Sequence, residues 1–589
     1  MNRAPVTLIG AGPAGLAAAH ELIERGVRPL VLEAGAEVGG IARTVVYKGC
    51  RFDIGGHRFF TRLESINRLW HRMLGTDFTF VKRSSRIFYN DRFFDYPLRA
   101  GNTLKNIGAA ESFKILISYL QAQLRRHPAD DTFEQWMTSR FGQRLFRIFF
   151  KTYTEKIWGL PCSAIRADWA AQRIRGLSML SLVANVLFGT RAAKTLIDGF
   201  YYPKKGPGMM WDRFERAIVH GGGEVRKGAQ VTGLIHADHR IRFLQVQNNG
   251  GDLISIPVHQ LISSMPIACL VGALDPPPPA EVQAAAAGLS YRALVMAGLI
   301  LDREDLFPDQ WIYIHDPGVA AGRIQNFKNW SPGMVSDGQC TNIGMEYFCN
   351  EGDATWNLSD AAIVEMASGE LEKLGLARHR DVVDALVIRQ PKAYPVYDRE
   401  YRRDLAVIRR YLDGFANLQT IGRNGTHRYS NMDHAMQSGI LAAQNALGAR
   451  HDLWAVNDEG EYLETPPADD AAGSAPGDII TRVFSRMDKR AFGAAVGTVT
   501  GLAICLATLW LVVKGGAVVG PKMGLLAQYF WGYTVTFKGA AVGLFYGFAG
   551  GFCAGWLFAF LRNALLVFYL FKIRKQVELN SLKDLLDRM

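Results

Sequence analysis

A glycine-rich turn near the start of the chain constrains the fold more than any other feature. Val6 to Ile9 is a short apolar run that predicts a buried parallel strand, and residues 16–25 have the pattern of a helix. Gly10, Gly12 and Gly15 lie between them as G-x-G-x-x-G. The first glycine allows a tight turn, the second lets a pyrophosphate approach the backbone, and the third lets the helix pack on the strand. The N-terminus of that helix offers N–H groups to the phosphates.

A second strand completes the unit. Pro29 to Leu32 is largely apolar and delivers Glu33, roughly 20 residues after the glycines, where a carboxylate accepts hydrogen bonds from a ribose. A glycine motif alone also occurs in unrelated turns between a strand and a helix. With strand, helix, second strand and acidic residue in register, the sequence predicts an α/β fold with a dinucleotide-binding domain of the Rossmann type.

The segment after Glu33 resembles a larger family. Gly39, Gly40 and Arg43 resemble the G-G-x-x-R of the FAD-dependent amine oxidase and protoporphyrinogen oxidase superfamily. The resemblance narrows to the UDP-galactopyranose mutases, because the run from Gly55 to Thr61 resembles their G-P-H-x-F-x-T segment. Five further segments resemble mutase motifs in the same order along the chain: Tyr89 to Leu98, Tyr153 to Gly159, Gly322 to Lys328, Tyr394 to Asp398 and Gly422 to Asp433.

The chain also departs from the mutase pattern. Gly56 replaces the proline that precedes the histidine in the mutase flavin segment. The mutase motif Y-R-Y is replaced by His427-Arg428-Tyr429, and the mutase motif I-E-H is replaced by Gln325-Asn326-Phe327. The diphosphate-binding R-x-P-x-R is not cleanly present. Its nearest candidates are Arg166, Arg173 and Arg175. The flavin end of the site is therefore better matched than the nucleotide end of the substrate.

The resemblance implies FAD as the cofactor and assigns residues to the site. Those expected to hold FAD are Gly10, Gly12, Pro13, Ala14, Gly15, Glu33, Ala34, Gly40, Arg43, Gly55, Gly56, His57, Val231, Gly422, Arg423, Met432 and Asp433. Those expected to act in catalysis are His57, Arg323, Tyr394 and Arg428, and those expected to contact substrate are Trp158, Arg173, Arg323, Tyr394 and Tyr429. Arg323 and Arg428 are the preferred phosphate clamps, because a guanidinium fork matches phosphate oxygens. No cluster with metal-ligand spacing is found, so no metal is expected.

The mutase resemblance implies that reduced flavin acts without net redox change, with NADH or NADPH as the external reductant. The implied substrate is a phosphate-activated sugar, either a UDP-sugar or a polyprenyl-phosphate sugar, and the product is a furanose donor for a cell-surface glycan. The alternative is an FAD-dependent oxidase or desaturase of an apolar substrate, because protoporphyrinogen oxidases and carotenoid desaturases share the glycine and G-G-x-x-R motifs. A third interpretation is a degenerate flavoprotein that serves as a membrane scaffold.

Two uncharged apolar runs lie near the end of the chain. Residues 491–513 and 539–561 would each span about 34 Å as a helix, enough to cross a bilayer core. Two buried core helices are the alternative. Glycines recur every four residues on one face of each run, at Gly493, Gly497 and Gly501 and at Gly539, Gly543, Gly547, Gly551 and Gly555. In lipid such faces let helix backbones approach closely, which predicts either a packed transmembrane hairpin or a homo-oligomer that uses the same faces.

Charge favours a cytosolic location for both ends of this hairpin. Four basic residues precede the first run, four follow the second, and three lie between them. The N-terminal MNRAPV has no apolar h-region, so no signal peptide is expected, and seven cysteines without C-x-x-C fit a reducing compartment. We therefore expect a multi-pass protein of a bacterial inner membrane, with a cytosolic catalytic domain and glycosyltransferases as candidate partners. The net charge of +12 suits an anionic membrane surface, and its dispersed basic residues argue against nucleic acid.

The predicted organisation is discontinuous. The FAD-binding domain is expected at 1–60, 204–265 and 415–450, and the substrate domain at 61–203, which is mostly helical, and at 266–414, which supplies strands. The acidic stretch at 456–480 is rich in Pro, Ala and Gly and has the character of a linker, and 562–589 is expected to form a cytosolic tail.

Three features each carry two interpretations. The basic residues Arg140, Arg144, Arg147 and Lys151 recur at about helical spacing. They form either a solvated face over an aromatic core or a surface for phosphate head groups. His57 is either a loop histidine or a neighbour of the flavin ring, and Trp158 is either a core residue or a stacking wall for a base or sugar.

Overall fold

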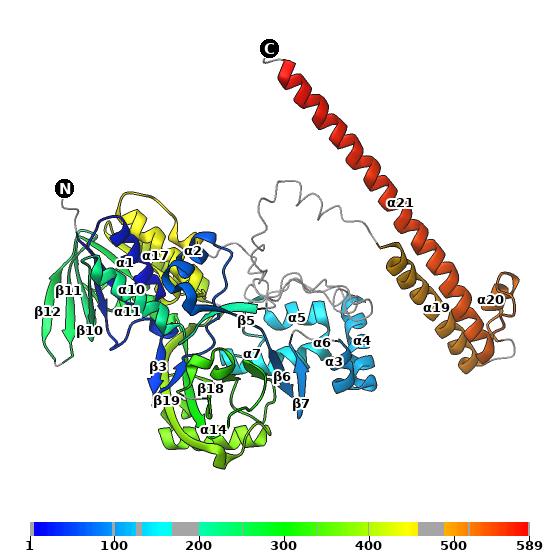
Figure 1. Ribbon diagram of the computed structural model, residues 1–589, viewed down its shortest axis with the longest axis horizontal. Coiled ribbons are helices and arrows are strands. Elements are labelled where there is room, and N and C mark those ends of the chain that lie inside the picture. The colour runs from blue at the N-terminus through cyan, green and yellow to red at the C-terminus, as the bar shows by residue number, and fades with distance from the viewer. Residues whose placement is uncertain are drawn as a thin grey trace. The chain divides into compact units, whose positions relative to one another are not determined.

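The computed structural model describes residues 5–96, 100–124, 132–167, 199–249, 251–336, 338–398, 400–456, 488–515 and 519–586. The described residues belong to two compact units (Figure 1), a catalytic unit that ends at residue 456 and a helical hairpin that begins at residue 488. Arg173, Arg175, Pro97 and Leu98 lie outside the described residues, as does nearly all of the linker expected at 456–480.

A parallel sheet of five strands forms the first layer of the catalytic unit. Its strand order is β20-β13-β1-β2-β9. The strands are β1 (Val6–Ile9), β2 (Leu30–Glu33), β9 (Glu224–Lys227), β13 (Gln260–Ser263) and β20 (Leu418–Thr420). The helices that pack with it in one core cluster are α1 (Pro13–Glu24), α2 (Glu64–Leu74), α10 (Gly208–His220) and α17 (Met432–Ala446). The predicted α/β fold with a strand–glycine turn–helix–strand start is confirmed.

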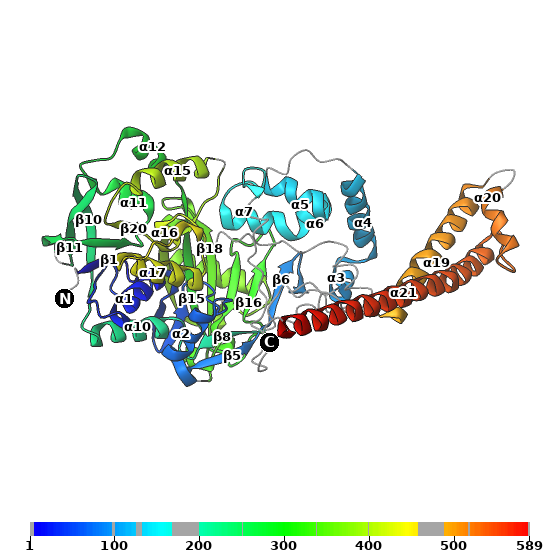
Figure 2. The ribbon, with the colours of Figure 1, turned by 90° about the horizontal axis from the view of Figure 1, so that it is seen from above.

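A second layer covers the other face of this sheet. It contains β10 (Ala229–Ala237), β11 (Arg240–Asn248), β12 (Leu253–Pro257) and β14 (Leu274–Asp275), with helices α11 (Ile267–Gly272), α12 (Ala280–Gly288) and α15 (Tyr401–Leu412). Figure 2 shows α12 and α15 on one side of the sheet and α1 and α10 on the other. The sequence analysis placed all of 266–414 in the substrate domain. The structure differs there, because the apolar residues of α11, α12 and α15 pack in one cluster with β10 and β11.

A mixed sheet of seven strands forms the other half of the catalytic unit. Its order is β19-β15-β18-β17-β16-β6-β7. The strands are β6 (Ser85–Tyr89), β7 (Arg92–Asp95), β15 (Tyr291–Leu301), β16 (Trp311–Ile314), β17 (Arg323–Asn326), β18 (Thr341–Cys349) and β19 (Val382–Pro395). Helices α13 (Ala354–Asn357) and α14 (Asp360–Lys373) accompany it. Its register pairs Arg323 with Glu346 and Arg292 with Tyr394, which places the candidate site on this sheet.

Two small two-stranded sheets and a helical group accompany the two large sheets. The smaller sheets pair β3 (Thr44–Tyr47) with β4 (Cys50–Asp53) and β5 (Phe78–Lys82) with β8 (Gly199–Pro203). The helices are α3 (Ala100–Ile107), α4 (Ala109–Leu124), α5 (Phe133–Phe141), α6 (Gln143–Phe146), the π-helical turn η3 (Arg147–Lys151) and α7 (Thr152–Trp158). A capping box between Thr132 and Gln135 starts α5, and Gly142 ends it with φ of 79°. The described part of 61–203 therefore holds these helices together with strands β5 to β8.

Two long helices dominate the second unit. α19 spans Lys489–Lys514 and is capped by Asp488, α20 spans Pro521–Gly524, and α21 spans Phe537–Leu586. Both long helices contain stretches that are long and apolar enough to cross a membrane, with mean hydropathy of 2.2 and 1.6. Beyond residue 561, where the sequence analysis expects a cytosolic tail, α21 continues to Leu586 as one helix. The stretch 562–586 contains neither Gly nor Pro, so no residue there favours an end to the helix.

The glycine faces of the two long helices meet each other. A Cβ on Gly501 would lie 2.6 Å from the Leu544 carbonyl oxygen, and one on Gly547 would lie 2.8 Å from Gly501 Cα. Thr500 Oγ1 donates to the Gly547 carbonyl oxygen across the same interface (2.7 Å). The faces expected to form either a hairpin or an oligomer contact are thus used within one chain, and a contact between copies would need another surface.

Candidate active site

The start of α1 forms a cradle that is built from backbone. Gly12 precedes Pro13, the first helical residue, and makes no side-chain capping bond, so the first N–H groups point toward the space in front of the helix. Gly39 donates its N–H to the Ala11 carbonyl oxygen (2.8 Å), which lays the next loop across the turn. A Cβ on Gly40 would lie 3.3 Å from Gly12 Cα. Glycine at both positions leaves room for a pyrophosphate to reach the backbone.

Glu33 lies at the end of β2, beside this cradle. Its Oε2 accepts the Ala11 N–H (2.7 Å) and its Oε1 accepts the Gly35 N–H (2.8 Å). Ala34 is the next residue of the chain, and Val231 of β10 packs in the core behind β2. The carboxylate is thereby fixed where a ribose hydroxyl would reach it.

The end of the catalytic unit packs directly on the cradle. A Cβ on Gly422 would lie 3.0 Å from Ala14 Cβ, and one on Gly439 would lie 3.1 Å from the Ala18 nitrogen. Gly15 is buried in the same contact region, in the first turn of α1. Segments about four hundred residues apart in the sequence thus form one site, as their motifs predict.

Buried polar atoms at the start of α17 lack a hydrogen bond among the described residues, although Asp433 Oδ1 lies 3.5 Å from His434 Nδ1. Met432 and Asp433 are its first two residues, and both are buried. Within the described part of the chain, neither Asp433 Oδ1 nor Ser430 Oγ makes a hydrogen bond. Buried polar atoms of this kind are normally satisfied, so they indicate a missing ligand. Together with the open helix terminus and Glu33, they fit FAD.

The segment after β4 links the cradle to the seven-stranded sheet. Gly55, with φ of +90°, and Gly56 bring the chain close to two side chains of that sheet. A Cβ on Gly56 would lie 3.0 Å from Gln325 Nε2, and one on Gly55 would lie 3.9 Å from Glu346 Oε2. The next residue, His57, therefore lies between the two halves of the site.

His57 is a neutral ring with a defined tautomer. Its Nε2 lies 2.9 Å from the Ile41 carbonyl oxygen and 2.9 Å from that of Ile54. Since both neighbours can only accept, Nε2 carries the proton and Nδ1 is an acceptor. Burial, followed by the charge of Arg423, lowers the pKa of His57 to about 4. The ring is therefore a fixed hydrogen-bond acceptor at neutral pH and carries no charge.

A buried ion pair forms the centre of the side-chain part of the site. Arg323 donates from Nε (3.0 Å) and from Nη2 (2.5 Å) to Oε2 of Glu346, which is fully buried. Gln325 donates to the other carboxylate oxygen. Burial disfavours the charged guanidinium, but Glu346 and the neighbouring tyrosines together outweigh this effect, so the pKa of Arg323 lies above its usual value. Nη1 of Arg323 makes no hydrogen bond to any described residue and remains available to a ligand.

Two tyrosines and a second arginine complete this arginine–tyrosine cluster, which we define as Arg323, Glu346, Tyr394, Arg423 and Tyr429. The Tyr394 hydroxyl lies 3.2 Å from Arg323 Nη2, and its ring stacks on Tyr429 with centroids 6.0 Å apart. The Arg423 guanidinium lies over the Tyr429 ring at 4.6 Å and over the Tyr394 ring at 5.5 Å. Arg423 also donates to the Ser430 carbonyl oxygen (2.8 Å), which ties the cluster to the start of α17.

The profile of the flavin-containing amine oxidoreductases matches residues 13–447. The chain belongs to this family. The structure of reduced UDP-galactopyranose mutase is similar, with a TM-score of 0.68 at 19% identity over 79% of this chain and 100% of the other. A protein assigned as a protoporphyrinogen oxidase from Exiguobacterium sp. 255-15 has a TM-score of 0.57 at 15% identity, over 75% of this chain and 99% of the other. Putrescine oxidase bound to putrescine has a TM-score of 0.51 at 16% identity, over 76% of this chain and 99% of the other. The predicted superfamily and mutase-like fold are confirmed.

Arg428, a predicted clamp of this flavoprotein, is placed differently from Arg323. Its Nη1 donates to the Trp454 carbonyl oxygen, near the end of the catalytic unit. Arg423, which the sequence analysis assigned only to FAD, instead contacts both cluster tyrosines. The two arginines are five residues apart, but the chain turns sharply between them at His427, whose φ is +47°. The structure therefore assigns the cluster position to Arg423.

Trp158 is a core residue of the flavoprotein. Only 3% of it is exposed, and it packs with Phe94 and Phe149. Its ring stacks on Tyr397 and meets Tyr394 edge-on, with centroids 6.3 and 6.5 Å apart. The sequence analysis assigned Trp158 to substrate contact. The structure supports the core interpretation instead, since the ring backs the cluster tyrosine and offers no open face to a sugar.

Sequence reasoning missed Glu346, Gln325 and Tyr153 as members of the site. Gln325 was noted only as a departure from the mutase pattern, and Glu346 not at all. Tyr153 stacks on buried His315 (4.8 Å between centroids), and burial raises the pKa of its hydroxyl. A carboxylate in the middle of the apolar run Thr341–Cys349 was the available signal, because buried carboxylates need a cationic partner.

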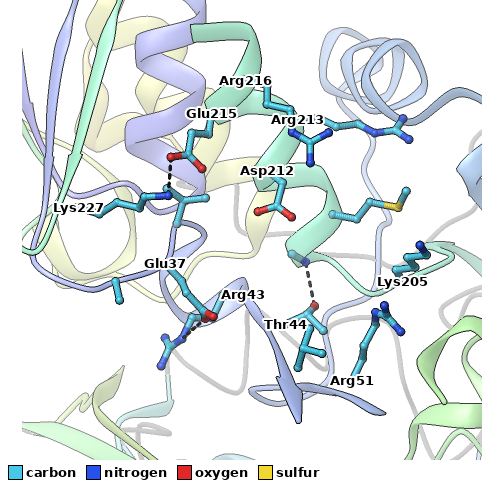
Figure 3. Close-up of a pocket in the computed structure, with 15 residues that line it drawn as sticks. Glu37, Arg43, Thr44, Arg51, Lys205, Asp212, Arg213, Glu215, Arg216 and Lys227 are labelled. Carbon is cyan, nitrogen blue, oxygen red and sulfur yellow. Dashed lines mark hydrogen bonds and ion pairs between the residues drawn. The ribbon is translucent and has the colours of Figure 1, made fainter. Parts of the chain in front are cut away.

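A polar cavity of about 470 Å³ lies on the outer side of the loop that follows Glu33 (Figure 3). It is lined by that loop, by β3 and by α10. Lys227 pairs with Glu215 (2.8 Å), Arg43 lies 3.9 Å from Glu37, and Asp212 points into the space between them. Arg43 also donates to the Gly40 carbonyl oxygen (2.8 Å), so it stiffens the loop over the cradle. The charged side chains that line the cavity carry an excess of positive charge, since six are basic and three are acidic.

Proposed function

We propose that this flavoprotein is a pyranose/furanose mutase that uses reduced FAD and acts on a phosphate-activated sugar. The observation that carries the proposal is the arginine–tyrosine cluster between the FAD cradle and the seven-stranded sheet. Arg323 keeps Nη1 available there, and Arg423 and two tyrosine rings lie beside it. An apolar substrate has no use for guanidinium groups, whereas a sugar phosphate does.

The residues have distinct tasks in this proposal. Glu346 holds Arg323 in place, so that its remaining donor meets phosphate oxygens as the leaving group gains charge. The Tyr394 hydroxyl extends this donor set, and His57 Nδ1 accepts a hydrogen bond at the flavin side of the site. When bound, reduced FAD supplies an electron-rich ring nitrogen to the anomeric carbon, with no net oxidation. The reductant in the proposal is NADH or NADPH.

In this proposal the sugar is carried either by UDP or by a polyprenyl phosphate. The second unit of the chain favours the polyprenyl phosphate, which is a lipid. Two helices of membrane-spanning length follow the catalytic unit in the same chain. We propose that they anchor the enzyme in a bacterial inner membrane with its catalytic unit in the cytosol, beside the glycosyltransferases that would consume a furanose donor.

The reaction is tested with the full-length protein in lipid nanodiscs. One sample of the enzyme is reduced with dithionite and a second sample is kept oxidised. UDP-galactopyranose or a polyprenyl-phosphate sugar is added to each sample, and the products are separated by chromatography. Furanose formed only by the reduced enzyme supports the proposal. Arg323→Ala should lose turnover but keep its flavin spectrum, whereas Arg303→Ala, an exposed arginine of the same unit, should retain both. Flavin that is reduced by an apolar substrate and reoxidised by oxygen or quinone would identify an oxidase instead.

The anchor and its orientation are tested by extraction and labelling. The protein should stay in the membrane fraction at alkaline pH. Cys269 is exposed on the catalytic unit. Because the catalytic unit is proposed to lie in the cytosol, Cys269 should react with a membrane-impermeant maleimide only after the cells are permeabilised. Labelling of Cys269 in intact cells would contradict a cytosolic catalytic unit.

A further inference from the structure

Helix α4 of the catalytic unit carries an apolar stripe on its exposed face. The stripe consists of Phe113, Leu116, Ile117, Leu120 and Leu124. Phe113 is 63% exposed and Leu124 is 87% exposed. The spacing of three and four residues places all five on one side of the helix.

The opposite face of α4 is the one that packs. Ile115 and Ala122 are buried, and Arg144 donates its backbone N–H to Ser118 Oγ (3.1 Å). A Cβ on Gly142 would lie 2.8 Å from the Tyr119 nitrogen, so the end of α5 lies directly against this face. The helix therefore packs through Ile115, Ser118 and Ala122 and leaves most of its large apolar side chains on the outside. Figure 2 shows α4 at the outer edge of the helical group, beyond α5 and α6.

The helical group that carries the stripe is basic. In residues 100–124 and 132–151 the charged residues are Lys105, Lys114, Arg140, Arg144, Arg147 and Lys151 against Glu111 and Glu134. Lys114 is exposed and adjoins Phe113, and Arg144 pairs with Glu111 (2.8 Å). A contiguous apolar patch with a polar rim marks a binding surface, and a basic rim complements anionic lipid head groups.

We infer that the α4 stripe of the catalytic unit lies in the head-group region of an anionic bilayer. A convex helix face with aliphatic side chains and basic flanks fits a lipid interface. A protein interface would instead be expected to offer Trp, Tyr and Arg at its centre. The chain also carries two helices of membrane-spanning length, so a bilayer is the partner that the rest of the molecule indicates.

This contact would bring the candidate site close to the lipid surface. Ile115 on the buried side of α4 belongs to the same core cluster as Trp158, against which Tyr394 packs. One small helical group thus carries the stripe on its outside and supports the arginine–tyrosine cluster on its inside. The inference does not rest on the reaction proposed above, but it does require that the hairpin anchors the chain.

The test is photo-crosslinking of the full-length protein in nanodiscs of phosphatidylcholine and phosphatidylglycerol. A diazirine amino acid replaces Ile117 or Leu120 in separate variants. A matched control replaces Val383, an exposed apolar residue of β19, and a positive control replaces Leu557 of α21. Lipid adducts at Ile117 and Leu120 should exceed those at Val383 by at least about tenfold, because interfacial contact scales with buried apolar area. The flavin spectrum shows that each variant is folded.

The two controls separate the possible failures. Adducts at Leu557 without adducts at Ile117 or Leu120 would overturn the α4 contact and leave the anchor intact. Absence of adducts at all of these positions would overturn the anchor together with the inference. A crosslink from Ile117 or Leu120 to protein, whether to a second copy or to another segment of the same chain, would also overturn the inference.

Discussion

The FAD cradle and the arginine–tyrosine cluster adjoin each other but are built by different means. The cradle is mostly backbone, namely a helix terminus without a side-chain cap and glycines in close contact. Its one fixed side chain is the carboxylate of Glu33, which accepts a backbone N–H. The cluster consists of side chains that are held by one another, with a buried ion pair at its centre. The cradle therefore suits a cofactor shared by many enzymes, whereas in the proposed function the cluster would determine which substrate is accepted.

The largest effect should follow from filling the cradle. A Cβ on Gly12 would meet only Gly40 Cα, at 3.9 Å, so Gly12→Val places its side chain in the ligand space without a protein clash. We expect the protein to fold but to retain at least about tenfold less FAD, measured as the ratio of flavin to protein absorbance after purification. Gly369→Val is the matched control, because nothing lies near Gly369. Normal flavin content in Gly12→Val would remove the cradle from the site.

The next effect should be on stability rather than on cofactor content. Glu346→Gln leaves the Arg323 guanidinium buried without a counter-charge, which should destabilise the protein by about 3–5 kcal/mol. Glu372→Gln, on the exposed side of α14, should be close to neutral. Thermal unfolding of the detergent-solubilised protein measures both. Equal stability of the two variants would show that the cluster does not depend on this ion pair.

A smaller effect, confined to turnover, is expected at the edge of the cluster. Tyr394→Phe removes one hydroxyl 3.2 Å from Arg323 Nη2 and keeps the stacked ring. We expect about a tenfold loss of kcat/KM, since a hydrogen bond contributes about 1 kcal/mol and more when one partner is charged. Stability should be unchanged. Tyr411→Phe serves as control, and an equal loss in that variant would exclude a specific role for Tyr394.

A further effect is a pH dependence, which arises from buried titratable side chains. Burial lowers the pKa of His57 to about 4, from an ordinary value of 6.5. Between these values the unfolded chain binds more protons than the folded one, so stability falls as the pH drops from 6.5 to about 4. His427 acts in the same direction with a pKa of about 4. Asp53, whose pKa burial raises to about 7, acts in the opposite direction, losing stability as the pH rises from 3.8 to about 7.

The contribution of His57 is isolated by comparison with His57→Gln, whose amide can still donate to the Ile41 and Ile54 carbonyl oxygens. Urea unfolding is followed by flavin fluorescence from pH 7 to pH 4. The free energy of unfolding should fall less steeply with decreasing pH in the variant, by at most about 1.4 kcal/mol per pH unit. Identical pH profiles would mean that the ring is not buried as a neutral group.

The same contrast explains what the sequence could predict. The cradle is local: Gly10, Gly12, Gly15 and Glu33 lie within one βαβ unit, so their spacing alone predicts their arrangement. The apolar helices are also local, and their starts at Lys489 and Phe537 lie within two residues of the predicted positions. The cluster depends on strand register across the seven-stranded sheet, where Arg323 pairs with Glu346. No short segment encodes that pairing, which is why Glu346 was missed. The choice of Arg428 over Arg423 has a local cause, because the chain turns sharply between them at His427.

The position of α17 along the chain has a consequence for biosynthesis. The FAD cradle is incomplete until Gly422 and α17, which ends at Ala446, have been made, and the first apolar helix begins only at Lys489. Domains fold as units while the ribosome is still extending the chain. The catalytic unit can therefore close around its flavin before the two long apolar helices have been translated. In the proposed membrane-anchored enzyme, cofactor loading would then precede membrane insertion, in the order in which the gene is read.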